Sequence, residues 1–302
     1  MGLATEARES LVTKRTPPSV VPPSRLFPAP ATPFDTEVAV LRAACVVRDD
    51  SELAGVSWIA HDDAPDAALC AIVRGEGGDG EYMARHLTSA LSSASRAPEL
   101  AVNAQRSVVV ASVDLADRMA AILAAASFVR SDDVFFGIAA EELAHGARLA
   151  LDPLVGDDAW RDWIAVERQI LAESIAPAPL TSALLDRTVE FKRRQQRHSP
   201  PIRRFVGRDE RGAPIAMIGY APFAPCDLGF ATKGVLVRLR DVAVAPAHRG
   251  RGVGTSLLRG IAARVIDECG ATQVMIGAAE TSAAIYRSVG AKELGRYVTF
   301  RG

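Results

Sequence analysis

Two hydrophobic periods follow one another late in the chain, and together they predict a strand, a turn and a helix. Between residues 235 and 244, apolar side chains occupy alternate positions, as in a strand with one buried face. The alternation slips partway by one residue, since its apolar members are Val235, Val237, Leu239, Val242 and Val244. A slip of one in a period of two predicts a β-bulge near Arg240 and Asp241.

A helical period begins after the turn. From Gly252 to a stop at Gly270, one helical face collects the apolar residues Val253, Leu257, Leu258, Ile261 and Val265. Other runs with strand character lie at 202–206, 213–220, 273–276 and 296–301, and a turn at 209–212 joins the first two. We therefore expect a hairpin, the bulged strand, the helix and two further strands.

The turn before this helix carries three glycines, Gly250, Gly252 and Gly254. Without Cβ atoms the backbone can direct successive N–H groups toward one anion. The start of the helix adds its unpaired N–H groups and the positive end of its dipole. Arg249 and Arg251 place positive charge at the rim. The segment is therefore a candidate socket for a diphosphate.

Residues Val242 to Thr255 resemble the acetyl-CoA-binding strand, turn and helix of the GNAT superfamily of acyl-CoA N-acyltransferases. Arg249, Gly252 and Gly254 match the family's Arg/Gln-X-X-Gly-X-Gly/Ala loop, and the segment 282–291 is similar to its helix ending in Leu-Tyr-X-X-X-Gly-Phe. The resemblance covers roughly the C-terminal half of the chain and implies an α/β fold of the α+β type, with helices flanking a central mixed, mostly antiparallel sheet. The alternative is a nucleotide-binding turn of another α/β family.

The resemblance also implies a reaction. Acetyl-CoA would be the donor, and its acetyl group would pass directly to a primary amine bound in the same cleft. Tyr286 stands at the place of the family's general-acid tyrosine and would protonate the departing thiolate, or would only pack against the pantetheine sulfur. The residues expected to bind the cofactor are Val242, Ala243, Val244, Arg249, Gly250, Arg251, Gly252, Val253, Gly254 and Thr255.

Two carboxylates close to the motif, Asp241 and Glu280, are candidates for the general base, because an amine must lose a proton before it can attack. Asp241 could equally make a structural hydrogen bond. Unpaired N–H groups around 242–244 would polarise the thioester carbonyl. Two positions depart from the family pattern: Ala279 replaces an Asn that contacts the cofactor, and Ala291 replaces a Phe.

The chain is about twice as long as one such domain, for which roughly 150 residues suffice. We divide it into a Pro-rich tail at 1–35, a first domain at 36–150 and the acyltransferase domain at 151–302. The tail is expected to be flexible, because proline disfavours helices and central strands. An arm that wraps the body or a partner is the alternative.

The first domain repeats the pattern of the second in blurred form. Strand-like runs at 38–47, 55–61 and 67–73 precede a glycine-rich turn at 74–80, a helix near Glu81, a strand at 107–111 and a segment, 121–129, that parallels 284–292. A tandem duplication accounts for this parallel, and an unrelated α/β domain is the alternative. Glu76 and Asp79 would repel a diphosphate, and Leu123 takes the place of Tyr286. The first copy is therefore expected to shape the acceptor cleft or a homodimer interface rather than to catalyse.

Two helices are expected between these regions. The first starts near 157 and carries Trp160 and Trp163 on one face, where packing between the domains is favoured over ligand stacking. The second, from about 181 to 196, leads into the basic residues Lys192, Arg193, Arg194, Arg197, His198, Arg203 and Arg204. A solvated helix end is the favoured interpretation of this basic cluster; an acidic substrate, the 3′-phosphate of the cofactor and nucleic acid are its alternatives.

Composition narrows the class of protein. Lysine and arginine number 35 against 36 acidic residues, and the basic cluster has no interleaved aromatic residues, so no nucleic-acid partner is expected. Four scattered cysteines lack the spacing of a metal site or a disulfide framework. The sequence has no apolar run of membrane length and no signal-peptide pattern, so we expect a cytoplasmic enzyme with neither a metal nor a membrane partner.

The expected function is transfer of an acetyl group from acetyl-CoA to a small-molecule or peptide amine. The alternative is a protein that binds acyl-CoA and changes its partner contacts without turnover, because the family's Asn is missing and the base is not assigned.

Overall fold

The computed structural model describes residues 22, 25–43, 45–49, 55–61, 64–74, 79–94, 107–174 and 182–302. Its strands are β1 (Cys45–Asp49), β2 (Val56–His61), β3 (Ala64–Val73), β4 (Ser107–Val110), β5 (Val129–Ala139), β6 (Ala150–Pro153), β7 (Arg203–Arg208), β8 (Pro214–Cys226), β9 (Gly234–Val244), β10 (Ala271–Ala279) and β11 (Lys292–Arg301). Its helices are α1 (Pro33–Arg42), α2 (Gly80–Ala94), α3 (Val113–Ala125), α4 (Ala140–Leu143), α5 (Gly156–Ser174), α6 (Ser182–Arg197), α7 (Val253–Cys269) and α8 (Ala283–Ser288), with short 3-10 turns η2 (Pro246–His248) and η3 (Glu280–Ser282).

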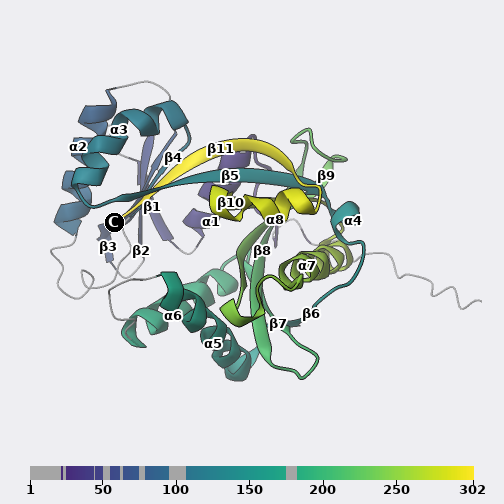
Figure 1. Ribbon diagram of the computed structural model, residues 1–302. Coiled ribbons are helices and arrows are strands. Elements are labelled where there is room, and N and C mark those ends of the chain that lie inside the picture. The colour runs from purple at the N-terminus through teal and green to yellow at the C-terminus, as the bar shows by residue number, and fades with distance from the viewer. Residues whose placement is uncertain are drawn as a thin grey trace, which may run out of the picture.

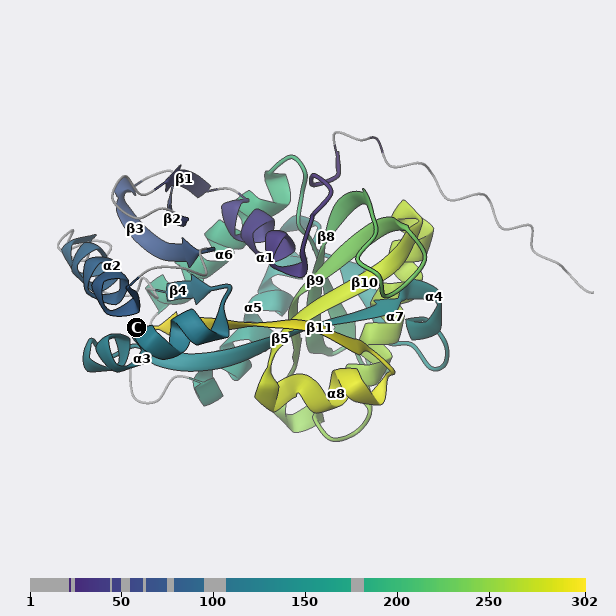
Figure 2. The same ribbon diagram turned by 90° about the horizontal axis from the view of Figure 1, so that it is seen from above.

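All of these strands join one sheet, in the order β1-β2-β3-β4-β11-β5-β10-β9-β8-β7-β6. Neighbouring strands are antiparallel, except that β3 pairs with β4 and β9 pairs with β10 in parallel. Parallel neighbours need a crossover connection, which α2 and α7 provide. Figures 1 and 2 show helices on both sides of this sheet. The expected mixed, mostly antiparallel sheet flanked by helices is confirmed.

The long strands β5 and β11 cross between the two parts of the chain, here called the N-terminal half (36–150) and the C-terminal half (151–302). β11 lies between β4 and β5, which belong to the N-terminal half, and β5 lies between β10 and β11, which belong to the C-terminal half. The sheet therefore continues across the expected boundary near 150. Residues of both halves can meet at this seam (Figure 2).

The same order of elements occurs once in each half. In the N-terminal half β3, α2, β4, α3 and β5 follow one another, and in the C-terminal half β9, α7, β10, α8 and β11 do so. In both series the first helix connects two parallel strands, and the last strand is inserted into the other half. This is the order of elements that the expected repeat requires.

Phe27, which lies in the tail expected to be flexible at 1–35, packs against the C-terminal half. Phe27 is buried and its ring stacks on Phe223, with 5.1 Å between the ring centroids. Its backbone N–H donates to the carbonyl of Pro222, and its carbonyl accepts from Ala224 N–H. The hydrogen bonds and the burial agree with the alternative, an arm against the body. The tail residues 1–21, 23 and 24 lie outside the described residues.

Helix α1 occupies the first part of the strand expected at 38–47. Thr32 and Asp35 form a capping box at its start, and Pro33 lies in its first turn, where a missing N–H costs nothing. Only Cys45–Asp49 of the expected strand forms β1. A short apolar run cannot be assigned to strand or helix by periodicity alone, and here the capping residues decide the outcome.

The two faces of β5 contact different helices, because successive side chains of a strand point to opposite sides. Val134, Phe136 and Ile138 pack in the core that contains residues of α7 and α8. Phe135 packs in the core that contains residues of α1. The sheet therefore separates an α7–α8 side from an α1 side.

Trp160 and Trp163 of α5 are both buried. They pack against Val206 of β7 and Met217 of β8, in a cluster that also contains Val189 of α6. The two tryptophans therefore have the expected packing role, but the expected packing between the domains is wrong, because the members of this cluster all belong to the C-terminal half.

Candidate active site

Strand β9 carries the predicted irregularity. Along β8, Met217 pairs with Ala243 and Gly219 with Arg240, so β9 has one more residue than β8 between these pairs. Asp241 lies within this segment and takes a φ of 53°, in the left-handed region. The predicted β-bulge at Arg240 and Asp241 is confirmed.

Beyond the bulge β9 and β10 separate. Their parallel pairing ends with Leu239 and Ile276, although β9 continues to Val244 and β10 to Ala279. β10 meanwhile remains paired with β5 as far as Ala279 and Asp133. On its β10 side, the end of β9 therefore has no strand partner, and an opening forms at the seam of the two halves.

The glycine-rich turn follows the end of β9. Gly250 and Gly252 take φ values of 72° and 77°, which side chains with a Cβ rarely adopt. A Cβ at either position would have no heavy atom within 4 Å, so the turn is open on that side. Gly254 differs, because a Cβ there would lie 2.5 Å from Ile285 Cδ1 of α8. The third glycine thus allows close packing of α7 on α8.

Helix α7 begins at Val253 with Gly252 at its N-cap, and no side chain caps it. The first N–H groups of a helix have no partner within the helix, so those of Val253 and Thr255 are available to a ligand. An uncapped start, an open turn and positive charge nearby fit the diphosphate of an acyl-CoA.

Arg249 and Arg251 lie differently at this turn. The Arg249 guanidinium donates from Nε to the Val244 carbonyl at 2.9 Å and pairs through Nη1 with Glu173 of α5 at 2.5 Å. Its side chain therefore ties the turn to the end of β9. Arg251 is exposed and has no hydrogen bond or ion pair among the described residues. Arg251 is thus the freer of the two cations for a phosphate.

A cavity of about 490 Å³ lies at the opening between β9 and β10. Its lining comes from both halves of the chain and comprises Glu37, Leu41, Ser107, Val109, Asp133, Leu239, Arg240, Asp241, Val242, Gly277, Ala278, Ala279, Ser282, Tyr286, Tyr297, Thr299 and Arg301. The sequence-predicted residues Asp241, Val242 and Tyr286 therefore meet at one cavity. Glu280 is absent from this lining.

Tyr286 lies on α8 and is largely buried. Its ring packs 5.6 Å from the ring of Phe136, between centroids. Burial raises the pKa of the Tyr286 hydroxyl to about 12, although the nearby charge of Arg238 opposes this. The hydroxyl therefore holds its proton at neutral pH, as a general acid must.

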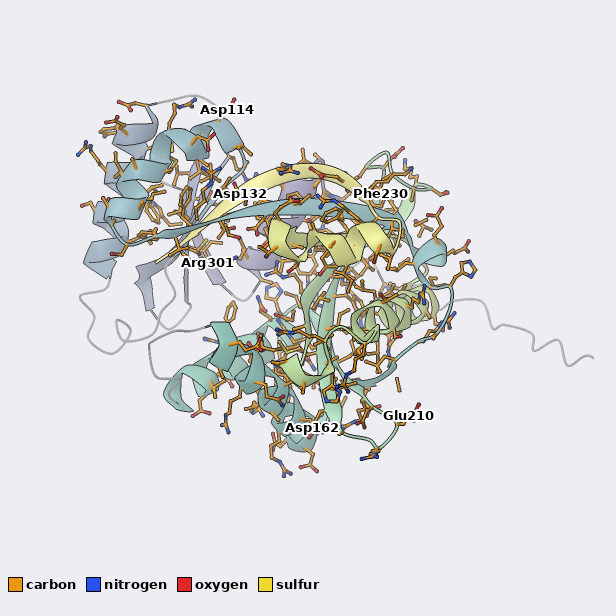
Figure 3. All side chains as sticks on the ribbon, viewed as in Figure 1. Asp114, Asp132, Asp162, Glu210, Phe230 and Arg301 are labelled. Carbon is orange, nitrogen blue, oxygen red and sulfur yellow. The ribbon has the colours of Figure 1, made fainter. Side chains whose placement is uncertain are left out.

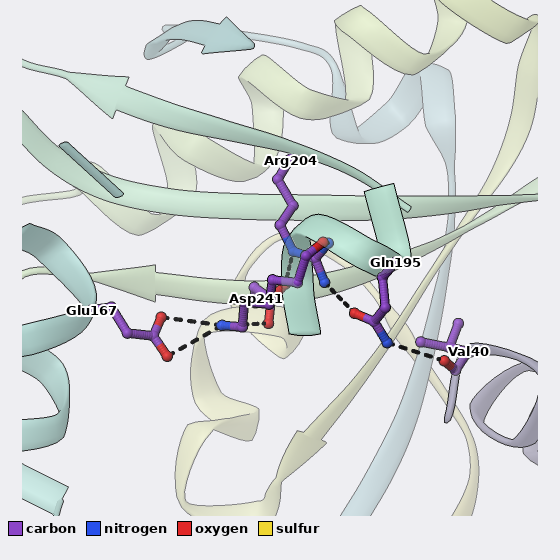
Figure 4. Close-up of polar contacts among 6 residues, drawn as sticks. Val40, Glu167, Gln195, Arg204 and Asp241 are labelled. Carbon is purple, nitrogen blue, oxygen red and sulfur yellow. Dashed lines mark hydrogen bonds and ion pairs between the residues drawn. The ribbon is translucent and has the colours of Figure 1, made fainter. Parts of the chain in front are cut away.

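Asp241 is held in a network of charged and polar groups (Figure 4). Its carboxylate accepts a 2.8 Å hydrogen bond from Arg204 Nε and lies 3.2 Å from Lys192 Nζ. Lys192 also contacts Glu167, and Arg204 donates to Gln195 Oε1 at 2.5 Å. These contacts join α5, α6, β7 and the bulge of β9.

The network settles the charge of Asp241. Burial alone would raise the pKa of Asp241, but the charges of Lys192, Arg204 and Arg240 outweigh burial and hold it far below its ordinary value. A carboxylate so strongly stabilised in its charged form is a weak base. The contacts agree with the structural hydrogen bond that was the alternative role of this residue.

Glu280 lies in η3, just after β10. It pairs with Arg287 at 2.8 Å and with Arg296 at 3.4 Å, and about two fifths of its side chain is exposed. The position places it beside the cavity rather than on its wall. Its role as a base stays a prediction.

The residues of the expected basic cluster differ in burial: Arg204 is buried, whereas Arg197 and His198 are exposed. Arg204 is almost completely buried, and the partly buried Lys192 lies between the carboxylates of Glu167 and Asp241. Arg203 pairs with Glu268 at 2.9 Å, and Arg193 with Asp157 at 3.1 Å. The solvated helix end favoured for this cluster is therefore wrong for Lys192 and Arg204, because the tertiary fold brings acidic partners to them.

The sequence did not indicate the role of Glu37, on α1. Its carboxylate accepts from Arg238 Nη2 at 2.7 Å and from Arg240 Nη1 at 2.8 Å. Burial would raise the pKa of Glu37, but the charges of Arg240 and Arg238 lower it to about 2. Two arginines at alternate positions of an otherwise apolar strand were the available signal, because buried cations need an anion. The sequence did not show which anion.

Taken together, a bulged strand, a separated neighbour, an open glycine-rich turn and an uncapped helix lie at the end of β9. Residues 162–291 match the model of the acetyltransferase (GNAT) family. This segment is a GNAT-family domain, and the protein is an acyltransferase of the kind that draws on acyl-CoA.

Several solved structures are similar to this chain. A functionally unknown conserved protein from Staphylococcus epidermidis ATCC 12228 has a TM-score of 0.57 at 11% identity, covering 84% of this chain and 93% of its own. A GCN5-related N-acetyltransferase from Kribbella flavida has a TM-score of 0.48 at 17% identity, covering 88% and 93%. A tandem GNAT protein from the clavulanic acid biosynthesis pathway has a TM-score of 0.47 at 15% identity, covering 91% and 90%. The first of these shows a shared fold.

No curated protein sequence matches this chain. Within the described residues, no helix combines the length and the apolar character needed to cross a membrane.

Proposed function

We propose that the protein is an N-acetyltransferase that moves an acetyl group from acetyl-CoA to a primary amine, by direct attack while both substrates are bound. The observation that carries the proposal is the opening between β9 and β10, with an uncapped α7 at one end and Tyr286 at its wall. A pantetheine arm in this opening would bring the thioester to the cavity. The acceptor is a small-molecule or peptide amine.

The chain offers a group for each step. At the end of β9, around 242–244, N–H groups on the side without a strand partner would bind the thioester carbonyl and stabilise the oxyanion that forms there. The amine nitrogen forms the new C–N bond, and the C–S bond then breaks. Tyr286 gives its proton to the departing sulfur. The buried Tyr286 hydroxyl is a weak acid, but a thiolate formed in the same cavity is also poorly solvated and takes up a proton more readily.

We also propose that the N-terminal half is a degenerate copy of the GNAT domain. The repeated order of elements supports this duplication. Its turn into α2 is closed by Asp79, whose carboxylate accepts from the N–H groups of Glu81 and Tyr82 at 2.9 and 3.2 Å. Leu123 is fully buried in the core of this half. Glu76 lies outside the described residues.

Isothermal titration of acetyl-CoA into the full-length protein tests the donor site. We expect one molecule to bind per chain with a dissociation constant in the micromolar range, which corresponds to a binding free energy on the order of −8 kcal/mol. The proposal would be overturned if correctly folded protein gave no heat of binding on titration with acetyl-CoA.

The variant Tyr286→Phe tests the acid. We expect the rate constant for thiol release to fall at least about 100-fold, as is typical when a general acid is removed, while the affinity for acetyl-CoA stays unchanged. Thiol release with a panel of primary amines provides the rate. Wild-type protein that binds acetyl-CoA tightly and acetylates no amine would instead favour the acyl-CoA sensor, and an unchanged rate in Tyr286→Phe would assign Tyr286 to packing.

A further inference from the structure

The cavity connects the two sides of the sheet. Phe136 of β5 contacts Tyr286 on the α7–α8 side. The ring of the adjacent residue, Phe135, stacks on the ring of Tyr297 on the α1 side, with 4.5 Å between the ring centroids. Asp133 is two residues from Phe135 and therefore shares the α1 side. Since Tyr286 and Asp133 both line the cavity, the cavity passes through the opening between β9 and β10.

With the cavity in this position, the acetyl donor and the acceptor amine would approach from opposite sides of the sheet. The glycine-rich turn and Tyr286 mark the side from which the thioester would enter. A nucleophile that attacks the carbonyl carbon without crossing the CoA chain must come from the other side, where Asp133, Glu37 and Tyr297 lie. The acceptor amine therefore meets the α1 side of the cavity.

Three carboxylates line the cavity, and their partners differ. Glu37 is paired with two arginines, and Asp241 with Lys192 and Arg204. Asp133 has no ion-pair partner among the described residues. Its Oδ2 accepts from Thr299 Oγ1 at 2.7 Å, and its Oδ1 accepts from Ser131 Oγ at 3.0 Å. Among these three carboxylates, Asp133 is thus the one without an ion pair in the described part of the chain, and the charge of Arg301 acts on it only from beyond contact distance.

Asp133 is also poised to take up a proton. Only 3% of the residue is exposed, and this burial raises the pKa of its carboxyl, with the nearby charge of Glu37 on α1 adding to the effect. The hydroxyls of Thr299 and Ser131 and the charge of Arg301 on β11 oppose the rise without cancelling it. Tyr297 faces the same carboxylate and remains neutral, since burial raises its own pKa.

A primary ammonium group fits this position. A carboxylate offers about four lone-pair directions, and the two hydroxyls occupy two of them. An ammonium group carries three N–H donors and a positive charge, so it would satisfy the remaining directions and neutralise the buried charge. A neutral alcohol would supply only one donor and no charge.

Resting on the proposed function, we infer that Asp133, a residue of the N-terminal half, binds the ammonium group of the acceptor and accepts the proton that it must lose. One N–H proton passes to Asp133 and then to solvent. The neutral amine attacks the carbonyl carbon, the C–N bond forms and the C–S bond breaks. Tyr286 protonates the thiolate and recovers its proton from the amide nitrogen. The N-terminal half therefore supplies a catalytic residue to the C-terminal half.

Asp133→Asn tests the role in turnover, with Asp132→Asn as its control. Asp132 is adjacent on β5 but points to the opposite side, and its side chain is half exposed. Its Oδ1 lies 2.8 Å from Arg130 Nη2. Figure 3 labels Asp132 and also Arg301 of the neighbouring strand β11. With the best amine of a panel comprising putrescine, lysine ethyl ester, tyramine and glucosamine, we expect Asp133→Asn to lower kcat/KM at least about 100-fold. In wild type, kcat/KM should fall at low pH as Asp133 takes up a proton, and this fall should be absent in Asp133→Asn. Asp132→Asn should remain within about threefold of wild type.

The affinity of Asp133→Asn for acetyl-CoA should be that of wild type. That comparison separates the two proposals: loss of acetyl-CoA binding in wild type overturns the proposed function, whereas wild-type kcat/KM in Asp133→Asn overturns only the role of Asp133.

Carboxyl-carbon NMR of the whole protein decides the inference without turnover. The Asp133 resonance is identified by its absence in Asp133→Asn, and methylammonium chloride serves as the probe. We expect a saturable change of this resonance and a lowered pKa of Asp133, neither of which tetramethylammonium, which has no N–H group, should produce. An equal response to both cations, or no response to either, would overturn the inference.

Discussion

Helices α2 and α7 occupy corresponding places in the two halves, yet the N–H donors at their first turns are used differently. At α2, the Asp79 carboxylate accepts hydrogen bonds from the N–H groups of Glu81 and Tyr82. At α7, Gly252 occupies the N-cap and has no side chain to offer. A carboxylate cap stabilises a helix by about 1 kcal/mol, and α7 forgoes this contribution. Free donors at α7 are what an anionic cofactor requires.

The strands beside these helices differ in the same sense. β3 and β4 remain paired up to their last residues, Val73 and Val110. β9 and β10 separate after Leu239 and Ile276, and a cavity forms between them. The N-terminal half therefore keeps its two parallel strands paired to their ends, whereas in the C-terminal half the corresponding strands separate.

The walls of the cavity contain buried ion pairs, and Glu37 takes part in two of them. Among the variants considered, Glu37→Gln should therefore have the largest effect on stability. Removing one partner of a buried pair leaves uncompensated charge, and we expect a loss of about 3–5 kcal/mol in the free energy of unfolding, measured with urea at pH 7. Glu81→Gln on α2 is the control, since its pair with Arg85 is largely exposed and should contribute less than about 1 kcal/mol. Equal losses in both variants would contradict the difference between the two sides.

Acid unfolding sharpens the same point. The pKa of Glu37 is 4.5 in the unfolded chain and falls to about 2 on folding, because the arginine charges outweigh burial. Its contribution is therefore complete above pH 4.5 and is lost as the pH falls from 4.5 toward 2, at about 3 kcal/mol in total. The free energy of unfolding, measured with urea at several pH values in this window, should therefore change less with pH in Glu37→Gln than in wild type. An identical change with pH in both proteins would mean that Glu37 is not held ionised.

Placing a carboxylate at the start of α7 should make it resemble the start of α2. In Gly252→Asp we expect the affinity for acetyl-CoA to fall at least about 100-fold, because a negative charge about 4 Å from a diphosphate costs several kcal/mol even with partial screening. Gly252→Asn has nearly the same shape without the charge and should lose less than about tenfold. Calorimetric titration of both variants provides the comparison, and similar losses would point to backbone strain rather than charge.

The reverse change at α2 should have the smallest effect. Asp79→Ala removes the cap and should lower the free energy of unfolding by about 1 kcal/mol. It should not create a second acetyl-CoA site, because β3 and β4 stay paired. Titration should still give one site per chain. A stoichiometry of two would show that Asp79 alone closes the N-terminal half.

Local patterns predicted the donor side well. The phase slip at Arg240 and Asp241 corresponds to the observed bulge, and the helical period from Val253 to Gly270 corresponds to α7. Both depend on neighbouring residues only. The strand expected at 38–47 was wrong for its first part, because the capping box of Thr32 and Asp35 acts on a run whose period is ambiguous.

The acceptor side could not be predicted in this way. Asp133 receives its hydrogen bond from Thr299, which is 166 positions away, and Glu37 meets Arg238 across 201 positions. No periodicity or spacing links such residues. Their meeting depends on the insertion of β5 between β10 and β11, which a single sequence does not indicate.

The sequence by itself determined the glycine-rich turn, the bulge and the helix behind them, because backbone freedom and hydrophobic period act over a few residues. Only the tertiary structure decided which cavity carboxylates have ion pairs and which one, Asp133, has none among the described residues. Burial and Coulomb interaction set the charge of a carboxylate, and both depend on the groups that folding brings within a few ångströms of it.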